Sequence, residues 1–510
     1  MKNTIKKITG CIVATTLIVF VLAKSTDILE KKSSDYKYIP FFEHAEDIDV
    51  LFLGTSHMLN AVYPMELYND YGITSYNFGG HANSLATTYW VMENALDYCK
   101  PKVVVIDCMQ LVQNTKTSEN FEYVHISLDA FPLSMTKVKA TLDLLNDYEY
   151  EKRLEEGEQN KKHTAMELLW NYSVYHSRWA DLTREDFIHD YTNEYGAESR
   201  IQIMQPGEIV ENPGTIMESE TIAMQYLQRM IECCREKGIK VLLTYLPYPM
   251  TSVSAWTDLN TADKIAGQHD VDYINLLKEN IVDFQTDCYD MNSHLNPAGA
   301  WKVTDYLGQY LTDHFDLEDH RGDTHYSYWD EDYITYEEMK LNRLKTVDDL
   351  NTYLMLLEDK AYGYILNVGD ATIFHDETTI NLLKNKGVDI NDIDYNTKYI
   401  FVCGEECIVV NKELSNGLID SSKKTRVYFN DGKQYGLYKG DQEIVVGNED
   451  DLKPEEGQIK VCVFDLNHSR DMLHISKFAI AEVSHNEYRN PDEKGQVILT
   501  SNATRVASDE

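Results

Sequence analysis

The sequence predicts an α/β protein with three parts: an N-terminal membrane helix, a large domain built on a parallel sheet, and a smaller α/β domain. Short apolar runs alternate with helical periodicity from residue 48 to about 315, as in parallel sheets that helices cover on both faces. A second series of helices and strands starts near residue 336. A basic, then apolar, segment precedes both.

The chain begins with a membrane signal. Lys2, Lys6 and Lys7 precede the uncharged residues 8–23, and Lys24 follows them. This segment is within reach of a membrane span if the lysines snorkel at its ends. No clear small-x-small cleavage site follows, so residues 1–25 are interpreted as an uncleaved signal anchor rather than a cleaved signal peptide. The positive-inside rule then predicts a single-pass cell-membrane protein with its bulk outside the cytoplasm.

The large domain is expected over residues 46–315, after a polar and aromatic stalk at 26–45. Glycine and proline mark the ends of several of its elements. Strands are predicted at 49–53, 73–78, 102–107, 239–246 and 272–276, and helices at 85–98, 219–237 and 299–315. The pattern breaks at about 110–215, where helical stretches at 134–145 and 163–178 predict an insertion that caps the carboxyl edge of the sheet.

The smaller domain is expected over residues 336–485, after an acidic linker at 316–335 and before a polar, disordered tail at 486–510. Asn430-Asp431-Gly432 is a hairpin signal. Helices are predicted at 347–358 and 377–386, and strands at 362–368, 398–403, 460–464 and 477–483.

Composition excludes some classes of function. The net charge of −37 supplies no cationic groove, so a nucleic-acid partner is not expected. Nine cysteines in 510 residues do not indicate a disulfide framework. Cys403 and Cys407 are interpreted as buried thiols flanking a hairpin turn, with a metal or redox pair as the alternative.

The serine at position 56 is a candidate nucleophile. It follows the apolar residues 50–53 and Gly54-Thr55, a setting in which a strand ends in a tight turn before a helix. The amino end of that helix offers N–H groups to an oxyanion. The alternative is that Ser56 is an ordinary helix N-cap.

A candidate base and its orienting acid lie in one loop some 240 residues further on. His294 stands just before a predicted helix, and Asp290 precedes it by four residues. A serine, a histidine and an aspartate brought together by an α/β fold make a nucleophile, a base and an orienter. The alternative is a solvated loop histidine and a surface carboxylate.

A glycine-rich turn after the second predicted strand is a candidate oxyanion hole. Gly79 or Gly80 would donate a backbone N–H, and Asn83 a side-chain N–H. The alternative is a turn whose glycines serve backbone geometry alone.

Taken together, these stretches resemble the SGNH (GDSL-like) hydrolase superfamily. Gly54-Thr55-Ser56-His57 is similar to the Gly-x-Ser-His block of its extracytoplasmic branch, which includes the teichoic-acid D-alanylation and alginate O-acetylation proteins. Asp290 to Gly299 resembles the final Asp-x-x-His-Leu-Asn block. The resemblance implies a flavodoxin-like three-layer αβα sandwich over roughly residues 45–315. It also implies that Ser56 is the nucleophile, His294 the base and Asp290 its partner.

The sequence departs from the family pattern at two places. Asp290 and His294 have three residues between them where the family has two. The Gly-x-Asn-Asp block is missing, and residues 107–110 (Asp-Cys-Met-Gln) stand in its place after the third strand. The asparagine donor must therefore be absent or come from elsewhere, such as Asn83. His57, and Arg178 among the aromatic residues of the insertion, are expected to contact an anionic or sugar substrate. The alternative for Arg178 is that it snorkels from an amphipathic lid helix.

The resemblance implies an acyl esterase or O-acyltransferase for a cell-surface polysaccharide or wall polymer, which needs no cofactor and no metal. A membrane-bound O-acyltransferase is the expected partner. The alternative is a catalytically inactive binding or assembly module that works with such an acyltransferase. Residues 362–368, 376–387 and 459–465 are weakly similar to an interleukin-like EMT-inducer domain, which implies an accessory role in binding a glycan or a partner.

Overall fold

The chain divides into two compact units by the contacts of its backbone. In this computed structural model, unit 1 consists of Met1–Glu198, Val210–Glu279 and Thr304–Tyr336, and unit 2 of Ser199–Ile209, Asn280–Val303 and Glu337–Glu510. The structure describes residues 2–29, 32–148, 151–152, 162–187 and 194–389, and in the C-terminal part 391, 393, 399–404, 407–410, 417–421, 425–430, 434–439, 442–448, 457–466, 472–480 and 503–506.

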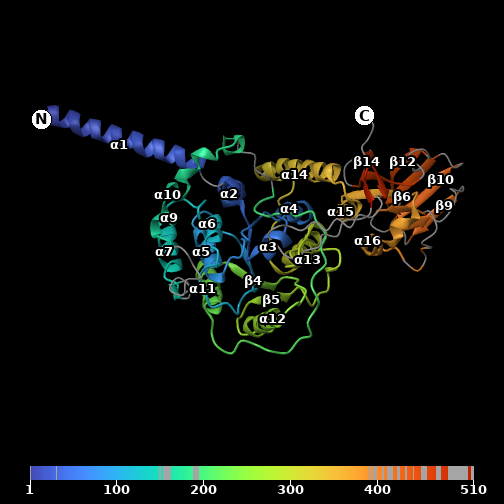
Figure 1. The fold of residues 1–510 in the computed structure, drawn as a ribbon, viewed down its shortest axis with the longest axis horizontal. Helices are drawn as coiled ribbons and strands as arrows, with labels where there is room; N and C mark the ends of the chain where they lie inside the picture. Colours follow the sequence, from blue (N-terminus) through green and yellow to red (C-terminus); the bar gives the residue numbers. More distant parts are fainter. Residues whose placement is uncertain are drawn as a thin grey trace. The chain divides into compact units, whose positions relative to one another are not determined.

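The helices are distributed along the chain from its start to residue 385 (Figure 1). They are α1 (Lys2–Leu29), α2 (Lys32–His44), α3 (Ser56–Ala61), α4 (Pro64–Tyr71), α5 (Leu85–Ala95), α6 (Glu122–Leu128), α7 (Met135–Leu144), α9 (Ala165–Leu169), α10 (Tyr172–Tyr175), α11 (Ile222–Lys237), α12 (Val253–Ala266), α13 (Pro297–His314), α14 (Ser327–Thr346), α15 (Leu350–Leu356) and α16 (Glu377–Asn385). Short 3-10 turns are η1 (Ala45–Asp47), η2 (His176–Ala180), η3 (Arg184–Phe187), η4 (Thr324–Tyr326) and η5 (Ala371–His375).

Unit 1 contains a five-stranded sheet in which every pairing is parallel. Its strands lie in the order β2-β1-β3-β4-β5, an order common in doubly wound α/β sheets. They are β1 (Val50–Leu53), β2 (Ser75–Asn77), β3 (Val103–Asp107), β4 (Lys240–Tyr245) and β5 (Asp272–Asn275). The parallel sheet expected from the apolar runs is thus confirmed, whereas membership of the SGNH type stays a prediction.

Local signals account for the bounds of these elements. All residues of β1 and β3 are buried, which is why both read as continuous apolar runs. Thr221 caps the start of α11 through its hydroxyl, and Gly238 ends it at a φ of 75°, where glycine carries no steric penalty. Strand β4 then begins at once, so helix and strand alternate without a long loop.

Unit 2 is built on antiparallel sheets. One has six strands in the order β15-β14-β13-β6-β7-β8, and the other has four in the order β12-β11-β10-β9. The strands are β6 (Tyr362–Val368), β7 (Tyr399–Cys403), β8 (Cys407–Val410), β9 (Gly417–Ser421), β10 (Thr425–Asn430), β11 (Gln434–Lys439), β12 (Gln442–Asn448), β13 (Gln458–Asp465), β14 (Met472–Ile480) and β15 (Ala503–Arg505). The antiparallel pairing of β10 with β11 confirms the hairpin, whose turn lies outside the described residues.

Three expectations about the connecting segments were wrong. The stalk at 26–45 is instead the end of α1 followed by α2, in which Tyr38 and Phe41 are buried against the aromatic rings of Phe78 and Phe131. Much of the linker at 316–335 belongs to η4 and α14, where Trp329 is fully buried. In the tail, residues 503–505 form strand β15, which pairs with β14, whereas 486–502 and 507–510 lie outside the described residues.

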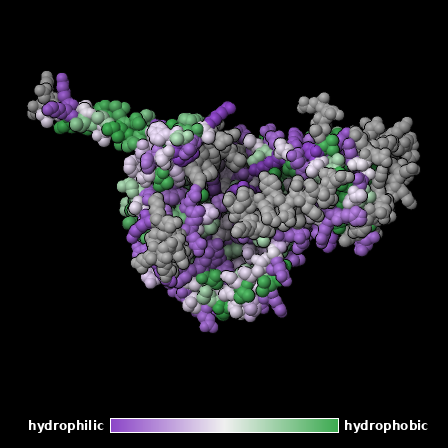
Figure 2. All heavy atoms as spheres, in the orientation of Figure 1, coloured by the Kyte–Doolittle hydropathy of each residue, from purple (hydrophilic) through white to green (hydrophobic). Residues whose placement is uncertain are grey.

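Helix α1 is long and apolar enough to cross a membrane. The candidate span is Thr4–Leu29; its most apolar stretch of 18 residues has no buried side chain, whereas Leu29 at its carboxyl end is buried. Figure 2 shows the apolar surface of this helix, with polar residues at its amino end. A signal sequence has the same properties, so the helix by itself leaves anchor and cleaved signal as alternatives.

The insertion is helical, as expected, with α7, α9 and α10 in the two stretches singled out from the sequence. The pair Cys403 and Cys407 flanks the turn between β7 and β8, which confirms the hairpin. The two residues form a disulfide rather than the expected pair of free thiols.

Candidate functional site

The end of β1 holds Ser56 in the setting that the sequence predicted. Strand β1 ends at Leu53, and α3 begins at Ser56 itself. A Cβ on Gly54 would lie 2.9 Å from the Cβ atoms of both Asp107 and Met58, so this turn requires glycine. The helix is capped by Thr55, whose hydroxyl accepts a hydrogen bond of 3.2 Å from the backbone N–H of His57. The interpretation of Ser56 as the N-cap is therefore wrong.

The glycine turn after β2 is hydrogen-bonded to the end of β1. The backbone N–H of Phe78 donates to the carbonyl of Phe52 over 2.8 Å, and that of Gly80 donates to the carbonyl of Gly54 over 3.2 Å. The N–H of Gly79 donates to Oδ1 of Asn77 over 2.8 Å. Both glycine N–H groups proposed as oxyanion donors thus already have acceptors. Their expected role is not supported by this geometry, and the backbone-geometry alternative is favoured.

The Asn83 side chain remains as a donor. It is 2% exposed, and its Oδ1 accepts a hydrogen bond of 2.8 Å from the hydroxyl of Ser127. Its Nδ2 is buried and has no hydrogen-bond acceptor among the residues that the structure describes. This nitrogen lies directly beside Gly80, because a Cβ built on that glycine would be 2.1 Å from it. An N–H group that is desolvated and unpaired can favour a developing negative charge.

A buried carboxyl group that the sequence analysis did not select, that of Asp107, lies beside Gly54 at the end of β1. Asp107 ends β3, is completely buried, and accepts long hydrogen bonds from the backbone N–H groups of Leu246 and Met109. Its Oδ2 has no hydrogen-bond partner in the described part of the chain. Burial raises the pKa of Asp107 to about 8, and the nearby carboxylate of Asp258 adds to this effect. The group therefore retains its proton at neutral pH.

A lysine on α2 was missed because its segment was interpreted as a stalk. Nζ of Lys37 donates a hydrogen bond to the carbonyl of Gly79. Burial lowers the pKa of Lys37 to about 7, although the carboxylate of Glu198 opposes this shift. The same carboxylate lies 3.1 Å from Nε2 of His81. A group of titratable side chains thus lies beside the glycine turn.

In unit 2, the loop before α13 brings the predicted base and acid together. Oδ2 of Asp290 lies 2.7 Å from Nδ1 of His294, and its Oδ1 accepts a hydrogen bond of 3.0 Å from the backbone N–H of the same histidine. Both side chains are largely buried, with exposed fractions of 13% for the histidine and 18% for the aspartate. The extra residue in this loop is accommodated, because the backbone turns back through Ser293 at a φ of 62°.

The rest of the loop keeps this pair in place. The ring of Tyr289 stacks on that of His294 with centroids 5.5 Å apart. The backbone N–H of Tyr289 donates a hydrogen bond of 2.9 Å to the backbone carbonyl of His294. Nδ2 of the buried Asn296 donates to the carbonyls of Thr286 and Gln202 over 2.7 and 3.1 Å. The imidazole is thus oriented by a carboxylate and a stacked ring on a loop tied down by side-chain hydrogen bonds.

The two residues expected to contact substrate have other contacts. The ring of His57 packs edge-on against that of Tyr248, with centroids 5.4 Å apart. Arg178 donates to the carbonyl of Leu29 and to the carboxylate of Asp186, each over 2.9 Å. Asp186 is itself 4% exposed. Because Arg178 also bonds to Leu29, it ties the insertion to the end of α1. Its role in gripping a substrate stays a prediction.

Ser56 belongs to unit 1, whereas His294 and Asp290 belong to unit 2, so the complete triad stays a prediction. A comparison with models of protein families finds no match, and a search of curated proteins finds none of significant similarity.

Proposed function

We propose that the chain is a membrane-anchored, extracytoplasmic acyl esterase or O-acyltransferase that acts on a cell-surface polysaccharide or wall polymer. The observation that carries this proposal is the pair of Asp290 and His294, in which the 2.7 Å contact between Oδ2 and Nδ1 orients the imidazole. Serine-dependent acyl chemistry needs an imidazole oriented in this way. The position of Ser56, directly after a parallel strand and a required glycine, supports the same assignment.

In the proposed reaction, Oγ of Ser56 attacks the carbonyl carbon of an acyl ester while Nε2 of His294 takes the hydroxyl proton. The tetrahedral intermediate is stabilised by the backbone N–H of Ser56 and by Nδ2 of Asn83. It collapses to an acyl-serine, and His294 returns the proton to the departing alcohol. A second hydroxyl, deprotonated by His294, then attacks the acyl-serine, the bond between the acyl carbon and Oγ breaks, and His294 returns the proton to Oγ of Ser56. Water as this acceptor gives hydrolysis, and a sugar hydroxyl gives transfer.

The proposed location rests on the N-terminal helix and the residues around it. Lys2, Lys6 and Lys7 flank the amino end of the apolar segment, which supports a cytoplasmic location of that end by the positive-inside rule. The disulfide between Cys403 and Cys407 supports the same topology, because disulfides persist mainly in oxidising compartments. We propose that both units lie outside the cytoplasm, where a membrane-bound O-acyltransferase is a partner that supplies acyl groups.

Labelling with a fluorophosphonate tests the catalytic proposal. The full chain in detergent is expected to react, and Ser56→Ala to lose the label. Ser219→Ala is the matched control, because Ser219 is exposed and precedes α11. His294→Gln should retain the fold but lose both labelling and the cleavage of a short-chain aryl ester. A wild-type chain that neither reacts nor cleaves the ester would rule the enzyme out.

The second candidate function is a catalytically inactive module that binds a surface polymer or assembles with an acyltransferase. The hydrogen bonds that occupy the N–H groups of Gly79 and Gly80 favour it, because they leave fewer donors for an oxyanion. This candidate predicts no labelling but retained binding to isolated wall polymer, with Ser56→Ala binding as well as the wild type.

A further inference from the structure

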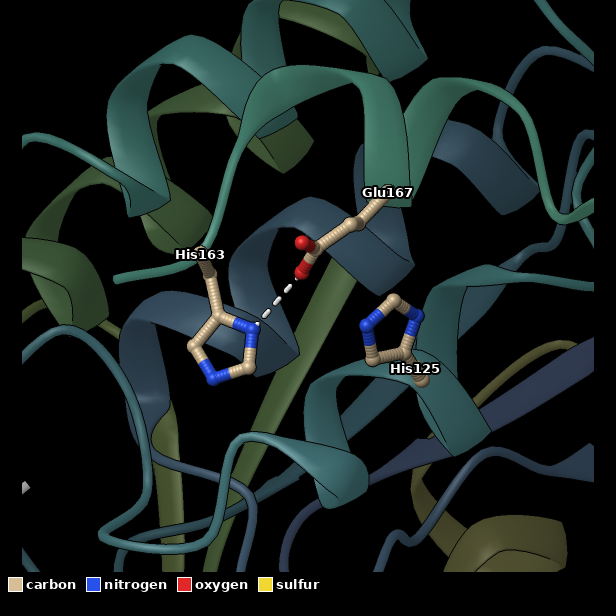
Figure 3. Close-up of side chains that lie close together, drawn as sticks. All are labelled: His125, His163 and Glu167. Atoms are coloured by element: carbon tan, nitrogen blue, oxygen red, sulfur yellow. Dashed lines mark hydrogen bonds and ion pairs between the residues drawn. The ribbon is translucent and has the colours of Figure 1, made fainter. Parts of the chain in front are cut away.

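The insertion of unit 1 contains a cluster of two histidines and a glutamate outside the candidate acyl site. His125 lies on α6, His163 precedes α9, and Glu167 lies on α9. One ligand atom from each lies within 4.8 Å of the other two. Figure 3 shows the three side chains converging from two separate segments, with one ring nitrogen of His125 facing the other two residues.

His125 is held with one nitrogen pointing into the cluster. Both carboxylate oxygens of Asp129 lie 3.1 Å from its Nδ1, one helical turn further along the chain. Asp129 is buried, and its Oδ2 also accepts a hydrogen bond of 2.8 Å from the hydroxyl of Tyr175. A carboxylate on Nδ1 keeps the proton there, so Nε2 presents its lone pair. This arrangement is the one that metal-binding histidines almost always have.

The other two residues complete a ligand set from one short segment. Nδ1 of His163 lies 2.8 Å from Oε2 of Glu167, four residues later. The imidazole ring is fixed by stacking on Phe121, with centroids 4.0 Å apart and planes 11° apart. The side chains of His163 and Glu167 are each 15% exposed, so the cluster is not sealed from solvent.

We propose that His125, His163 and Glu167 bind a divalent transition-metal ion of the zinc type. Two imidazole nitrogens and one carboxylate oxygen are a zinc ligand set, and they disfavour Mg²⁺ and Ca²⁺, which take oxygen ligands. Bond lengths of about 2.0–2.1 Å place tetrahedral ligands roughly 3.3 Å apart, so small side-chain movements close the site. A fourth position is left for water, and the ion ties α6 to α9.

Without an ion, the same residues form an ordinary ion pair beside a buried histidine. That alternative explains the contact between His163 and Glu167. It gives no reason for Nε2 of His125 to face them while Nδ1 is held by a buried carboxylate. The metal site accounts for both, and it predicts that the three residues act together although they come from two segments.

The test is zinc binding by the full chain in detergent after dialysis against a chelator. We expect one tightly held zinc per chain by elemental analysis, and a raised thermal midpoint on its addition, because the ion binds only the folded state. Cobalt(II) should give the intense visible absorption of a tetrahedral site. Excess Mg²⁺ or Ca²⁺ should displace neither ion, which separates the site from general binding to an acidic protein.

Variants assign the ligands. His125→Gln and Glu167→Gln should each weaken zinc binding at least 100-fold, and Asp129→Asn should weaken it about 10- to 100-fold through loss of the support at Nδ1. His176→Gln is the matched control, because this exposed histidine lies in the same insertion. Circular dichroism checks that each variant is folded. Zinc uptake that is equal in the wild type and in folded His125→Gln, or absent from the wild type, would overturn the proposal.

Discussion

Replacing the buried Asp107 by asparagine should stabilise the protein, and the gain should increase with pH. The carboxyl group is completely buried, and burial raises its pKa from 3.8 to about 8. The folded chain therefore keeps a proton between about pH 4 and pH 8 that the unfolded chain releases. Stability falls as pH rises through this window, because ionisation is favoured only in the unfolded state. Asparagine has nearly the same shape and no proton to lose.

The magnitude follows from linkage between protonation and folding. One proton retained by the folded state alone changes the free energy of unfolding by about 1.4 kcal/mol per pH unit. Between pH 5.5 and pH 8, the stability of Asp107→Asn relative to the wild type should therefore rise by about 3 kcal/mol. The lower pH stays above the isoelectric point of about 4.7, so precipitation does not interfere.

Urea unfolding followed by tryptophan fluorescence measures this difference, because urea does not screen charges and five tryptophans belong to unit 1. They are Trp90, Trp170, Trp179, Trp256 and Trp329. The control is Asp270→Asn, which removes an exposed carboxylate and should give a small difference at all pH values. A stability difference for Asp107→Asn that stays constant or decreases from pH 5.5 to pH 8 would refute the assignment of a buried, protonated carboxyl.

Two further predictions concern the candidate acyl site. If His294 is the base, Asp290→Asn should lower aryl-ester cleavage by about 10³- to 10⁴-fold, because the amide no longer holds the imidazole tautomer; unchanged cleavage would remove this carboxylate from the mechanism. Gly54→Ala should destabilise the protein by roughly 1–3 kcal/mol, because its Cβ would lie 2.9 Å from two neighbouring Cβ atoms. Gly267→Ala is the control, because the nearest atoms to its Cβ lie at 3.6 and 3.7 Å, and urea unfolding should show little change.

The elements best predicted from the sequence are those whose signals are local and strong. Strand β6 covers residues 362–368 as expected, since the segment is apolar apart from Asn367 and is buried throughout. Helix α11 was expected at 219–237 and begins at residue 222, three residues late, because Thr221 is the cap and the residues before it are outside the helix. Such signals fix the type of an element firmly and its first residue less firmly.

The segments that were misinterpreted carry a burial pattern that their polarity conceals. In α14, the buried side chains recur at helical spacing over a strongly acidic sequence; they are Trp329, Tyr333, Tyr336, Lys340 and Leu344. Tyrosine and lysine have low values on hydrophobicity scales. Both can nevertheless bury most of the side chain while the polar end forms a hydrogen bond or an ion pair. For Lys340 that partner is the buried carboxylate of Asp359, at 2.8 Å. A search for helical spacing among aromatic residues would have found this helix.

The candidate sites show the same division between local and distant information. Asp290 and His294 are four residues apart, so the sequence alone predicted a contact that one loop makes. The buried state of Asp107 depends instead on strands β1, β3 and β4 lying side by side, which separates it from the many exposed carboxylates of an acidic chain. The histidine cluster likewise requires α6 and α9 to meet, and only the fold brings His125 to Glu167. Residue type therefore predicts contacts between residues of one loop. Where the contacting residues are far apart in the sequence, the chemistry of a side chain depends on the neighbours that the fold brings to it.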